Sequence, residues 1–283
     1  MDNHPNDNST PPLLEINLTG IIRSRAGWKG RLLPRFLLGA LERLICQRRL
    51  NEILREVWPA RGSDFARRVM EVQRISLTTE GLDKLPPEES FIFACNHPLG
   101  GLDGICMVKV LGEFFGDDNI RVMVNDMLMN VAPLAGVFLP VNKYGSQGRK
   151  SARLLNEALA SGKQIVMFPA GLVSRLHDDG GIRDLEWQKS VIAKAIESGR
   201  RIVPVFFDGL NTSRFYRTAL MRKRLGLKIN IEQALLPSEL CRAEGASYRI
   251  IFGSPLSPDE LHGSSAKEKA AALRDRCYSL CAG

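Results

Sequence analysis

Short apolar runs alternate with longer amphipathic stretches from residue 74 to the end of the chain. The runs are rich in Ile, Val and Phe and have the length of strands; they cover 74–81, 90–95, 120–125, 137–142, 164–169, 201–207, 227–232 and 248–253. Between them, helical patterns lie near 103–115, 148–161, 186–198, 213–224 and 258–281. Strands that alternate with helices predict an α/β fold, in which a largely parallel central sheet is flanked by helices.

The segment before residue 74 has a different pattern. In residues 37–58, Leu, Ile, Val and Trp recur at helical spacing. Residues 23–68 contain twelve basic and four acidic residues, an excess of +8 that equals the net charge of the whole chain. This combination is typical of an amphipathic helix or hairpin at a membrane interface. It is equally compatible with a helical cap that packs on the core and leaves its arginines in water.

We therefore divide the chain into a disordered lead at 1–22, a basic amphipathic helical segment at 23–73 that docks on a membrane, and an α/β domain at 74–283. The lead has neither the basic flank nor the apolar stretch of a signal peptide. No uncharged apolar run reaches the roughly 18 residues that a membrane-spanning helix needs. A protein of this kind would lie on a membrane surface.

Composition narrows the functional classes further. With 44% hydrophobic and 25% charged residues, the chain can form a sizeable core, which excludes a wholly disordered or collagen-like protein. A pI near 9.3 suggests an anionic partner, namely nucleic acid, a membrane surface or a phosphorylated ligand. The six cysteines form no CxxC pair, which favours a reduced, cytosolic setting.

The first candidate chemistry follows the apolar run at 90–95. This run leads into NHPLGGLDG at residues 96–104, and the carboxyl end of such a strand is where α/β proteins place ligand-handling side chains. Pro98 and the Gly100-Gly101 pair favour a turn, which can bring Asp103 back to accept a hydrogen bond from His97. The other ring nitrogen of His97 is then available as a general base. The alternative is a purely structural loop histidine next to a helix N-cap aspartate.

These residues resemble the NHxxxxD signature of the PlsC-like glycerolipid acyltransferases, in which the His and Asp form the catalytic pair. Asn96, His97 and Asp103 would be its members here, with five residues in place of four between His and Asp. We assign the extra residue to the Gly100-Gly101 turn. Further blocks follow in the family's order: VFLPVNKYG at 137–145, FPAGLVSR at 168–175 and RIVPVFF at 201–207. By this resemblance, Lys143 of the second block contacts the acceptor head group, and Lys189 stands where the family often has a basic residue.

The third block keeps Gly171, Ser174 and Arg175 as candidate substrate-binding residues. It has Ala170, Leu172 and Val173 where the family has the Glu, Thr and Arg that help to bind a glycerol phosphate. The blocks NHPLGGLDG and FPAGLVSR, together with the region 211–253, more closely resemble the bacterial hemolysin-like branch of the family. That branch includes enzymes that add the ester-linked acyl chain of ornithine and glycine lipids.

The resemblance implies an O-acyltransferase of lipid biosynthesis that uses neither a metal nor a bound cofactor. The acyl group would come from an acyl thioester, in first place on acyl carrier protein and otherwise on acyl-CoA. It would pass to the hydroxyl of a lyso-ornithine or lyso-glycine lipid, or of a lysophospholipid. Backbone N–H groups near Gly171 are candidate stabilisers of the oxyanion. The expected location is the cytoplasm, at the inner face of the cytoplasmic membrane.

Two other classes of function are compatible with the same residues. The first is a non-catalytic membrane or nucleic-acid binding module that retains the fold. The second is a lipid hydrolase in which His97 and Asp103 activate water instead of a lipid hydroxyl. The run at 214–228 has six basic residues and no acidic one, but no nucleic-acid-binding signature accompanies it. Anionic lipid or an acidic acyl carrier explains its charge more economically. No GxSxG elbow and no zinc-type histidine spacing occur, and Cys95 is interpreted as a buried structural thiol.

Overall fold

The computed structural model describes residues 13–25, 34–141, 145–226 and 231–282. Seven strands form the main sheet in the order β1-β9-β8-β2-β5-β3-β4. Their bounds are β1 (Ser76–Glu80), β2 (Ile92–Cys95), β3 (Ile120–Asn125), β4 (Phe138–Val141), β5 (Gln164–Met167), β8 (Ile202–Asp208) and β9 (Ser247–Phe252). All neighbours pair in parallel except β8 and β9, which are antiparallel. The predicted α/β fold with a largely parallel sheet is confirmed.

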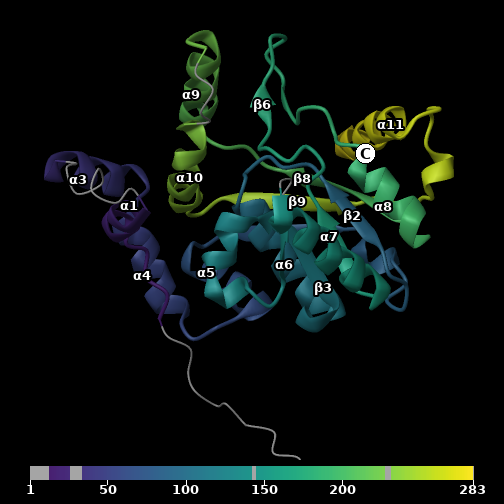
Figure 1. Cartoon of the computed structure of the whole chain (residues 1–283), viewed down its shortest axis with the longest axis horizontal. Helices are drawn as coiled ribbons and strands as arrows, with labels where there is room; N and C mark the ends of the chain where they lie inside the picture. Colours follow the sequence, from purple (N-terminus) through teal and green to yellow (C-terminus); the bar gives the residue numbers. More distant parts are fainter. Residues whose placement is uncertain (1–12, 26–33, 142–144, 227–230, 283) are drawn as a thin grey trace, which may run out of the picture.

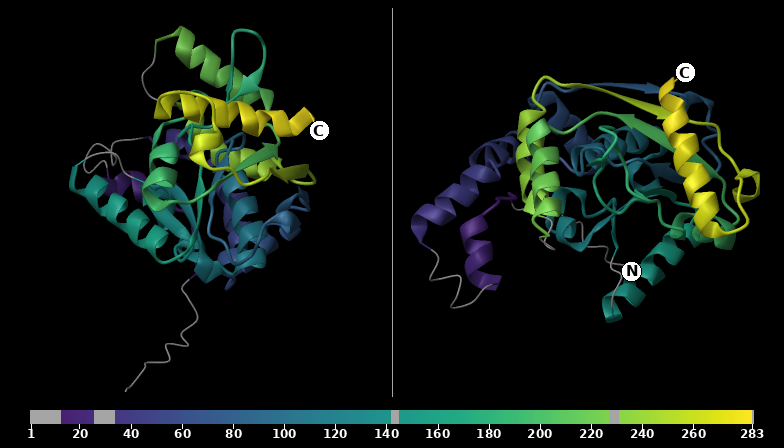
Figure 2. Two further views of the ribbon diagram at one scale, coloured as in Figure 1. Left: turned by 90° about the vertical axis from the view of Figure 1, so that its right-hand side faces the viewer. Right: turned by 90° about the horizontal axis from the view of Figure 1, so that it is seen from above.

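Helices cover both faces of this sheet (Figures 1 and 2). The helices are α1 (Leu18–Arg25), α3 (Arg35–Leu44), α4 (Gln47–Val57), α5 (Gly62–Val72), α6 (Leu102–Phe115), α7 (Gly145–Ala160), α8 (Ser190–Ser198), α9 (Ser213–Arg224), α10 (Leu236–Arg242) and α11 (Ala266–Ser279). Short 3₁₀ turns are η1 (Leu82–Lys84), η2 (Asp117–Asn119), η3 (Asp126–Asn130), η4 (Ala132–Leu134), η5 (Ile231–Leu235), η6 (Pro258–Glu260) and η7 (Leu280–Ala282). A small hairpin, β6 (Arg175–Leu176) with β7 (Ile182–Arg183), stands outside the sheet.

Strand β2 lies at the centre of the sheet and is buried on both faces. Its side chains alternate between two hydrophobic cores, as the two-residue period of a strand requires. Phe93 and Cys95 pack in the core that contains α5 and α6, whereas Ile92 and Ala94 pack in the core that contains α7, α8 and α11. A strand buried on both sides is held rigidly, and the loop that follows it therefore starts from a fixed point.

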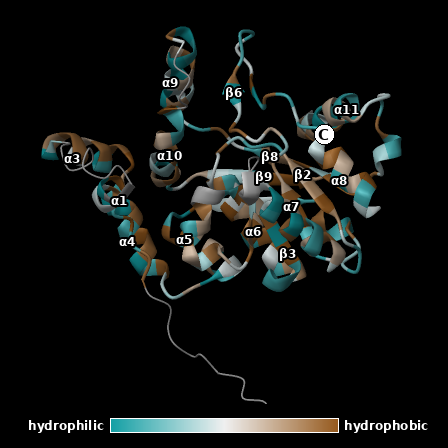
Figure 3. Cartoon of the chain, viewed as in Figure 1, coloured by the Kyte–Doolittle hydropathy of each residue, from teal (hydrophilic) through white to brown (hydrophobic). Residues whose placement is uncertain are grey.

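In the N-terminal segment, the neighbouring helices α3 and α4 differ in how they meet the core. Helix α4 packs Ile53 and Val57 into the core and is a cap. Helix α3 buries only Leu38 and exposes Phe36, Leu37 and Leu41, which gives it an apolar outer face (Figure 3). Within the described residues, no helix combines the length and the apolar character that crossing a bilayer requires.

Two sequence predictions are wrong in detail. The predicted disordered lead reached residue 22, but α1 begins at Leu18 because Asn51 and Gln47 of α4 bind the backbone of Ile16 and Leu18. The predicted strand at 227–232 falls partly on residues outside the described range. Its last two residues open the η5 turn instead, where the Glu232 carboxylate is buried against arginines rather than aligned along a sheet edge.

Candidate active site

The candidate site lies where β2, β5 and β8 end side by side. These three strands are parallel neighbours, so the segments that follow them meet at one edge of the sheet. Asn96 anchors this edge: its amide donates to the Phe207 carbonyl at 3.0 Å and accepts from the Phe207 N–H at 2.6 Å. Both ends of the buried Asn96 amide are thus engaged with backbone. Asn96, predicted to bind substrate, instead fixes the end of β2. The chain then enters the loop 97–101, named the catalytic loop after its candidate catalytic residue His97.

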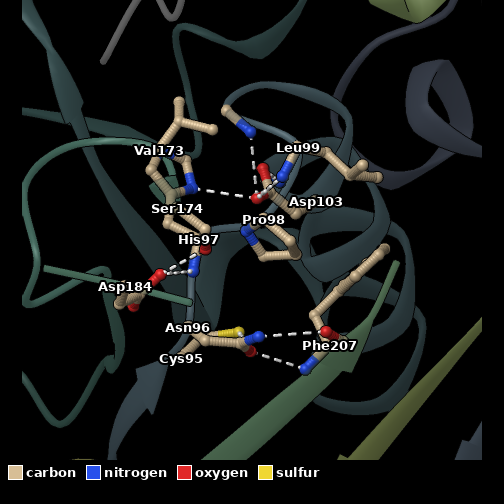
Figure 4. A network of polar contacts seen from close by, with 12 residues as sticks. Cys95, Asn96, His97, Pro98, Leu99, Asp103, Val173, Ser174, Asp184 and Phe207 are labelled. Atoms are coloured by element: carbon tan, nitrogen blue, oxygen red, sulfur yellow. Dashed lines mark hydrogen bonds and ion pairs between the residues drawn. The ribbon is translucent and has the colours of Figure 1, made fainter. Parts of the chain in front are cut away.

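His97 and Asp103 come together as predicted, despite the longer spacer. His97 Nδ1 lies 2.9 Å from Asp103 Oδ2. Asp103 is fully buried in the first turn of α6, and its carboxylate also accepts backbone N–H groups from Leu99, Gly100 and Gly104 at 3.0, 3.1 and 2.9 Å (Figure 4). Four donors therefore fix the carboxylate, and the carboxylate fixes the imidazole.

Gly100 makes the five-residue spacer possible. It has a φ of +76°, in the left-handed region that other residues rarely adopt. A Cβ at this position would overlap the side chain of Val173, whereas one at Gly101 would meet nothing within 4 Å. The loop turns back on itself at Gly100, and the assignment of the extra residue to the Gly100-Gly101 turn stays a prediction.

The electrostatics of the pair favour a charged His97 beside an ionised Asp103. Burial lowers the pKa of His97, but the charge and hydrogen bond of Asp103 and the charge of Asp184 outweigh it, so the pKa rises above its usual 6.5. Burial raises the pKa of Asp103, but His97 and the N–H groups of the loop outweigh it and the net direction is downward. The site thus stabilises an imidazolium, the species that a general base becomes after it takes a proton.

The Nδ1 side of the His97 imidazole is engaged by Asp103, and its open side is the Nε2 side. The His97 side chain is 17% exposed, and no described residue accepts or donates a hydrogen bond at Nε2. The Phe168 ring lies against the imidazole, with 4.3 Å between ring centroids. The imidazole is therefore held by Asp103 on one edge and by Phe168 on one side, and Nε2 is left for a substrate.

Asp184 is a second buried carboxylate at this site, and sequence reasoning missed it. Its Oδ1 accepts the His97 backbone N–H at 3.1 Å and the Ser174 hydroxyl at 2.6 Å, and its Oδ2 accepts Trp187 Nε1 at 2.8 Å. Burial raises the pKa of Asp184. Asp184 lies 87 residues after His97 in no recognisable motif, so only the fold could reveal it.

The third block packs under the catalytic loop through this network. Ser174 donates its N–H to the His97 carbonyl at 2.8 Å and its hydroxyl to Asp184, and its side chain is buried. Gly171 has a φ of +66° and gives its own N–H to the Phe168 carbonyl at 2.9 Å. The neighbouring N–H groups of Leu172 and Val173 have no acceptor among the described residues. They are the donors that this loop leaves for a ligand.

Arg175 is engaged inside the protein rather than open to solvent. It donates to Glu232 at 2.8 Å and to the Val173 carbonyl at 2.6 Å, and Glu232 also lies 3.0 Å from Arg222 Nε. Burial lowers the pKa of Arg175. The guanidinium also lies over the Phe215 ring, 5.5 Å from its centroid. The third block is thereby joined to α9 and η5.

The remaining predicted residues lie apart from the pair. Lys189 is exposed immediately before α8, and no contact joins it to His97 or Asp103 in the described part of the chain. Lys143 falls in 142–144, outside the described residues. Cys95 is fully buried at the end of β2, and burial raises the pKa of its thiol well above the ordinary value, consistent with the structural interpretation. Among described residues, no three His, Cys, Asp or Glu side chains gather as a metal site would need.

A parallel sheet that carries a buried His–Asp pair after its central strand, beside the loop 168–175, has the arrangement that the PlsC-like resemblance predicted. The family model described as Acyltransferase matches residues 21–283. The chain belongs to this family and is an acyltransferase, so the predicted class of enzyme is confirmed.

Three known proteins are similar to this chain. A lyso-glycine lipid O-acyltransferase from Phocaeicola vulgatus is 37% identical over 241 residues, which are 85% of this chain and 86% of the relative. A lyso-glycine lipid O-acyltransferase from Bacteroides thetaiotaomicron is 36% identical over 269 residues, which are 95% of this chain and 98% of the relative. The crystal structure of the 1-acyl-sn-glycerophosphate acyltransferase PlsC from Thermotoga maritima matches 87% of this chain and 88% of its own, with 16% identity and a TM-score of 0.49.

Proposed function

We propose that this acyltransferase moves a fatty acyl group from an acyl thioester to the hydroxyl of a lyso-glycine lipid. The observation that carries the proposal is the His97–Asp103 pair, held by four hydrogen bonds with Nε2 left for substrate. Two relatives of nearly the same extent bear the name of this activity. Acyl carrier protein is the favoured donor, with acyl-CoA as the alternative.

In the proposed mechanism, His97 acts as a general base on the acceptor hydroxyl. Nε2 takes the hydroxyl proton while the oxygen attacks the thioester carbonyl, and a tetrahedral oxyanion forms. When the oxyanion collapses, the C–S bond breaks and the imidazolium returns its proton to the departing thiolate. The products are an ester and a free thiol, and the enzyme ends in its starting protonation state. Asp103 orients the ring and stabilises its charged form.

The N–H groups of Leu172 and Val173 are the proposed oxyanion donors. They belong to the turn whose next residue, Ser174, is hydrogen-bonded to the backbone of His97, which ties this turn to the loop that carries the proposed general base. Donors that are already oriented lower the barrier because they need no reorganisation as charge develops. The sequence predicts oxyanion donors near Gly171, and because the N–H of Gly171 itself is engaged, the proposal assigns this role to the two residues after it.

The head group of the acceptor is proposed from the third block. Ala170 and Val173 are buried and apolar where other family members carry polar side chains for a glycerol phosphate. An amino-acid head group is therefore expected to be accepted in preference to a phosphate monoester. A lyso-ornithine lipid is the second candidate, and a lysophospholipid is the third.

We also propose that the enzyme works at the inner face of the cytoplasmic membrane, bound through α1 and α3. Phe36, 71% exposed, and its neighbours Leu37 and Leu41 form an apolar face on a helix that has Arg43 in its last turn. Most arginines of α4 and α5 are already paired, for example Arg55 with Glu15 and Arg68 with Asp64. The arginines of α4 and α5 are thus engaged within the protein, and apolar insertion of α3 is expected to contribute more of the membrane affinity than their charge.

The test is transfer of a labelled acyl group from acyl carrier protein in the presence or absence of lyso-glycine lipid. The proposal expects labelled ester only when acceptor is present, and a smaller yield when lysophosphatidic acid replaces it. His97→Ala should lower kcat by about 10² to 10⁴-fold with unchanged circular dichroism, and His262→Ala, at an exposed histidine, should have no effect. Labelled free acid without acceptor would instead identify a hydrolase, and no product from any donor would identify a binding module.

A further inference from the structure

A groove on the outer side of α9 lies apart from the His97–Asp103 pair. Its volume is about 300 Å³, and its lining includes Arg214, Arg217, Met221, Leu225 and Ile231. Met221 and Leu225 are 63% and 65% exposed, which places them among the most exposed large apolar residues described. Figure 1 shows α9 above α10, and Leu44, the last residue of α3, packs against the cluster on the inner face of α9.

One face of α9 presents both apolar and cationic groups. Arg214, Arg217, Met221 and Leu225 follow one another at spacings of three and four residues, so they share one side of the helix. Arg214 and Arg217 are exposed and form no ion pair with a described residue. No acidic residue occurs from 214 to 228. The outer face therefore carries uncompensated positive charge beside exposed apolar surface, the composition of a binding surface for an acidic partner.

The inner face of α9 is firmly held. Phe215 and Tyr216 are buried with Val173 and Leu235 in a separate hydrophobic cluster. Arg222 reaches Glu232, which also binds Arg175. Packing and ion pairing on the inner side thus hold the helix without any contribution from Arg214, Arg217 or Met221. These outer residues are available for recognition.

The groove is connected to the catalytic loop at the start of α9. The Asn211 amide, two residues before the helix, donates to the Pro98 carbonyl at 3.0 Å, directly after His97. A helix of 12 residues is roughly 18 Å long, so the whole outer face lies within about that distance of the loop along the helix axis. A partner on this face could deliver a group on a long flexible arm to the His97 imidazole.

We propose that the outer face of α9 is the docking surface for an acidic acyl carrier protein, which brings the acyl chain on its phosphopantetheine arm. This inference rests on the proposed thioester donor. The acceptor is a lipid and reaches the enzyme from the bilayer, for which α3 offers an apolar face, whereas a carrier protein arrives from water. A concave, arginine-lined groove receives a convex acidic helix better than it receives a flat bilayer.

The test compares donors on paired variants. Arg214→Glu/Arg217→Glu reverses the charge of the groove, and Lys84→Glu/Arg276→Glu makes the same change of net charge at exposed lysine and arginine residues elsewhere. Each protein is assayed with palmitoyl-acyl carrier protein and with palmitoyl-pantetheine, which lacks the protein. Binding of the holo carrier protein is measured separately by titration, without acceptor. Sedimentation with anionic vesicles is measured for both variants.

The proposal expects Arg214→Glu/Arg217→Glu to weaken carrier binding and raise the KM for the carrier-bound donor by about tenfold or more. Its kcat/KM for palmitoyl-pantetheine and its vesicle binding should stay within about twofold of the unchanged enzyme. Equal effects on both donors, an unchanged affinity for the carrier, or a loss of vesicle binding in place of carrier binding would each overturn the docking surface. Failure of transfer from every donor would overturn the proposed function instead, and the binding titration would still decide the docking.

Discussion

At the scale of single residues, Asp184 is the least expected member of the site. It holds the backbone of His97, the hydroxyl of Ser174 and the indole of Trp187 with one carboxylate, and it acts on the imidazole through its charge. We describe it as a positioning residue, since it acts through His97 and makes no contact with the Nε2 side.

Asp184→Asn should move the acidic limb of the pH–rate profile. His97 must be neutral to accept a proton, so kcat/KM rises with pH through the pKa of His97, which lies above 6.5. Asp184 contributes to this upward shift, and removal of its charge should therefore move the midpoint to lower pH. The measurement is kcat/KM between pH 5 and 9. The control is Asp179→Asn, in the exposed turn between β6 and β7, which should leave the midpoint unchanged. If the midpoint does not move in Asp184→Asn either, the role of Asp184 is structural only.

Substitutions at Gly100 and at its neighbour Gly101 allow a controlled test of the turn between His97 and Asp103. Gly100→Ala places a Cβ against Val173 in a left-handed backbone, which should cost about 1–3 kcal/mol of stability and shift Asp103 away from His97. We expect a lower midpoint of thermal unfolding and at least about a tenfold loss of kcat, since small misplacements of catalytic groups are costly. Gly101→Ala, with open space at its Cβ, should change both far less. Similar losses in the two variants would contradict the assigned role of Gly100.

At the scale of elements, α3 and α4 differ although they are adjacent and both amphipathic. The apolar side of α4 meets the core, and its arginines pair with local acids such as Glu52. The apolar side of α3 buries only Leu38, and Figure 3 shows this largely hydrophobic helix at the edge of the molecule. The cap interpretation thus holds for α4, and the membrane interpretation stays a prediction for α3.

Phe36→Ser/Leu37→Ser should weaken membrane binding and leave the fold intact, because both side chains are exposed on α3. Loss of two apolar side chains from an interfacial helix should lower the fraction that sediments with anionic vesicles by several-fold, at about 1–2 kcal/mol for each large side chain. Ile196→Ser on α8 removes an exposed apolar side chain elsewhere and is the control. Unchanged sedimentation of the α3 variant would remove this helix from the proposed membrane contact.

At the scale of the whole molecule, the sequence predicts best what is local. The turn at Gly100 and the approach of His97 to Asp103 depend on residues within one short segment, and both are present. The predicted strands, each a short local run, are also present apart from 227–232, whose described residues open η5. Asp184 lies 87 residues after its partner His97, and Glu232 lies 57 residues after its partner Arg175. Their positions depend on the packing of α11, α9 and η5, which no local pattern encodes. For the same reason, the sequence could not show that Arg175 is neutralised inside the protein.

Helix α11 also supports the site from the far side of the sheet's core. Tyr278 contacts the backbone N–H of Asp184 through its hydroxyl, and the Cys277 thiol donates to the Val205 carbonyl beneath the catalytic loop. Leu273 and Cys277 also fill the core on that side of β2. Loss of α11 would therefore remove a partner of Asp184 and part of the core at the same time, so that stability and activity should fall together.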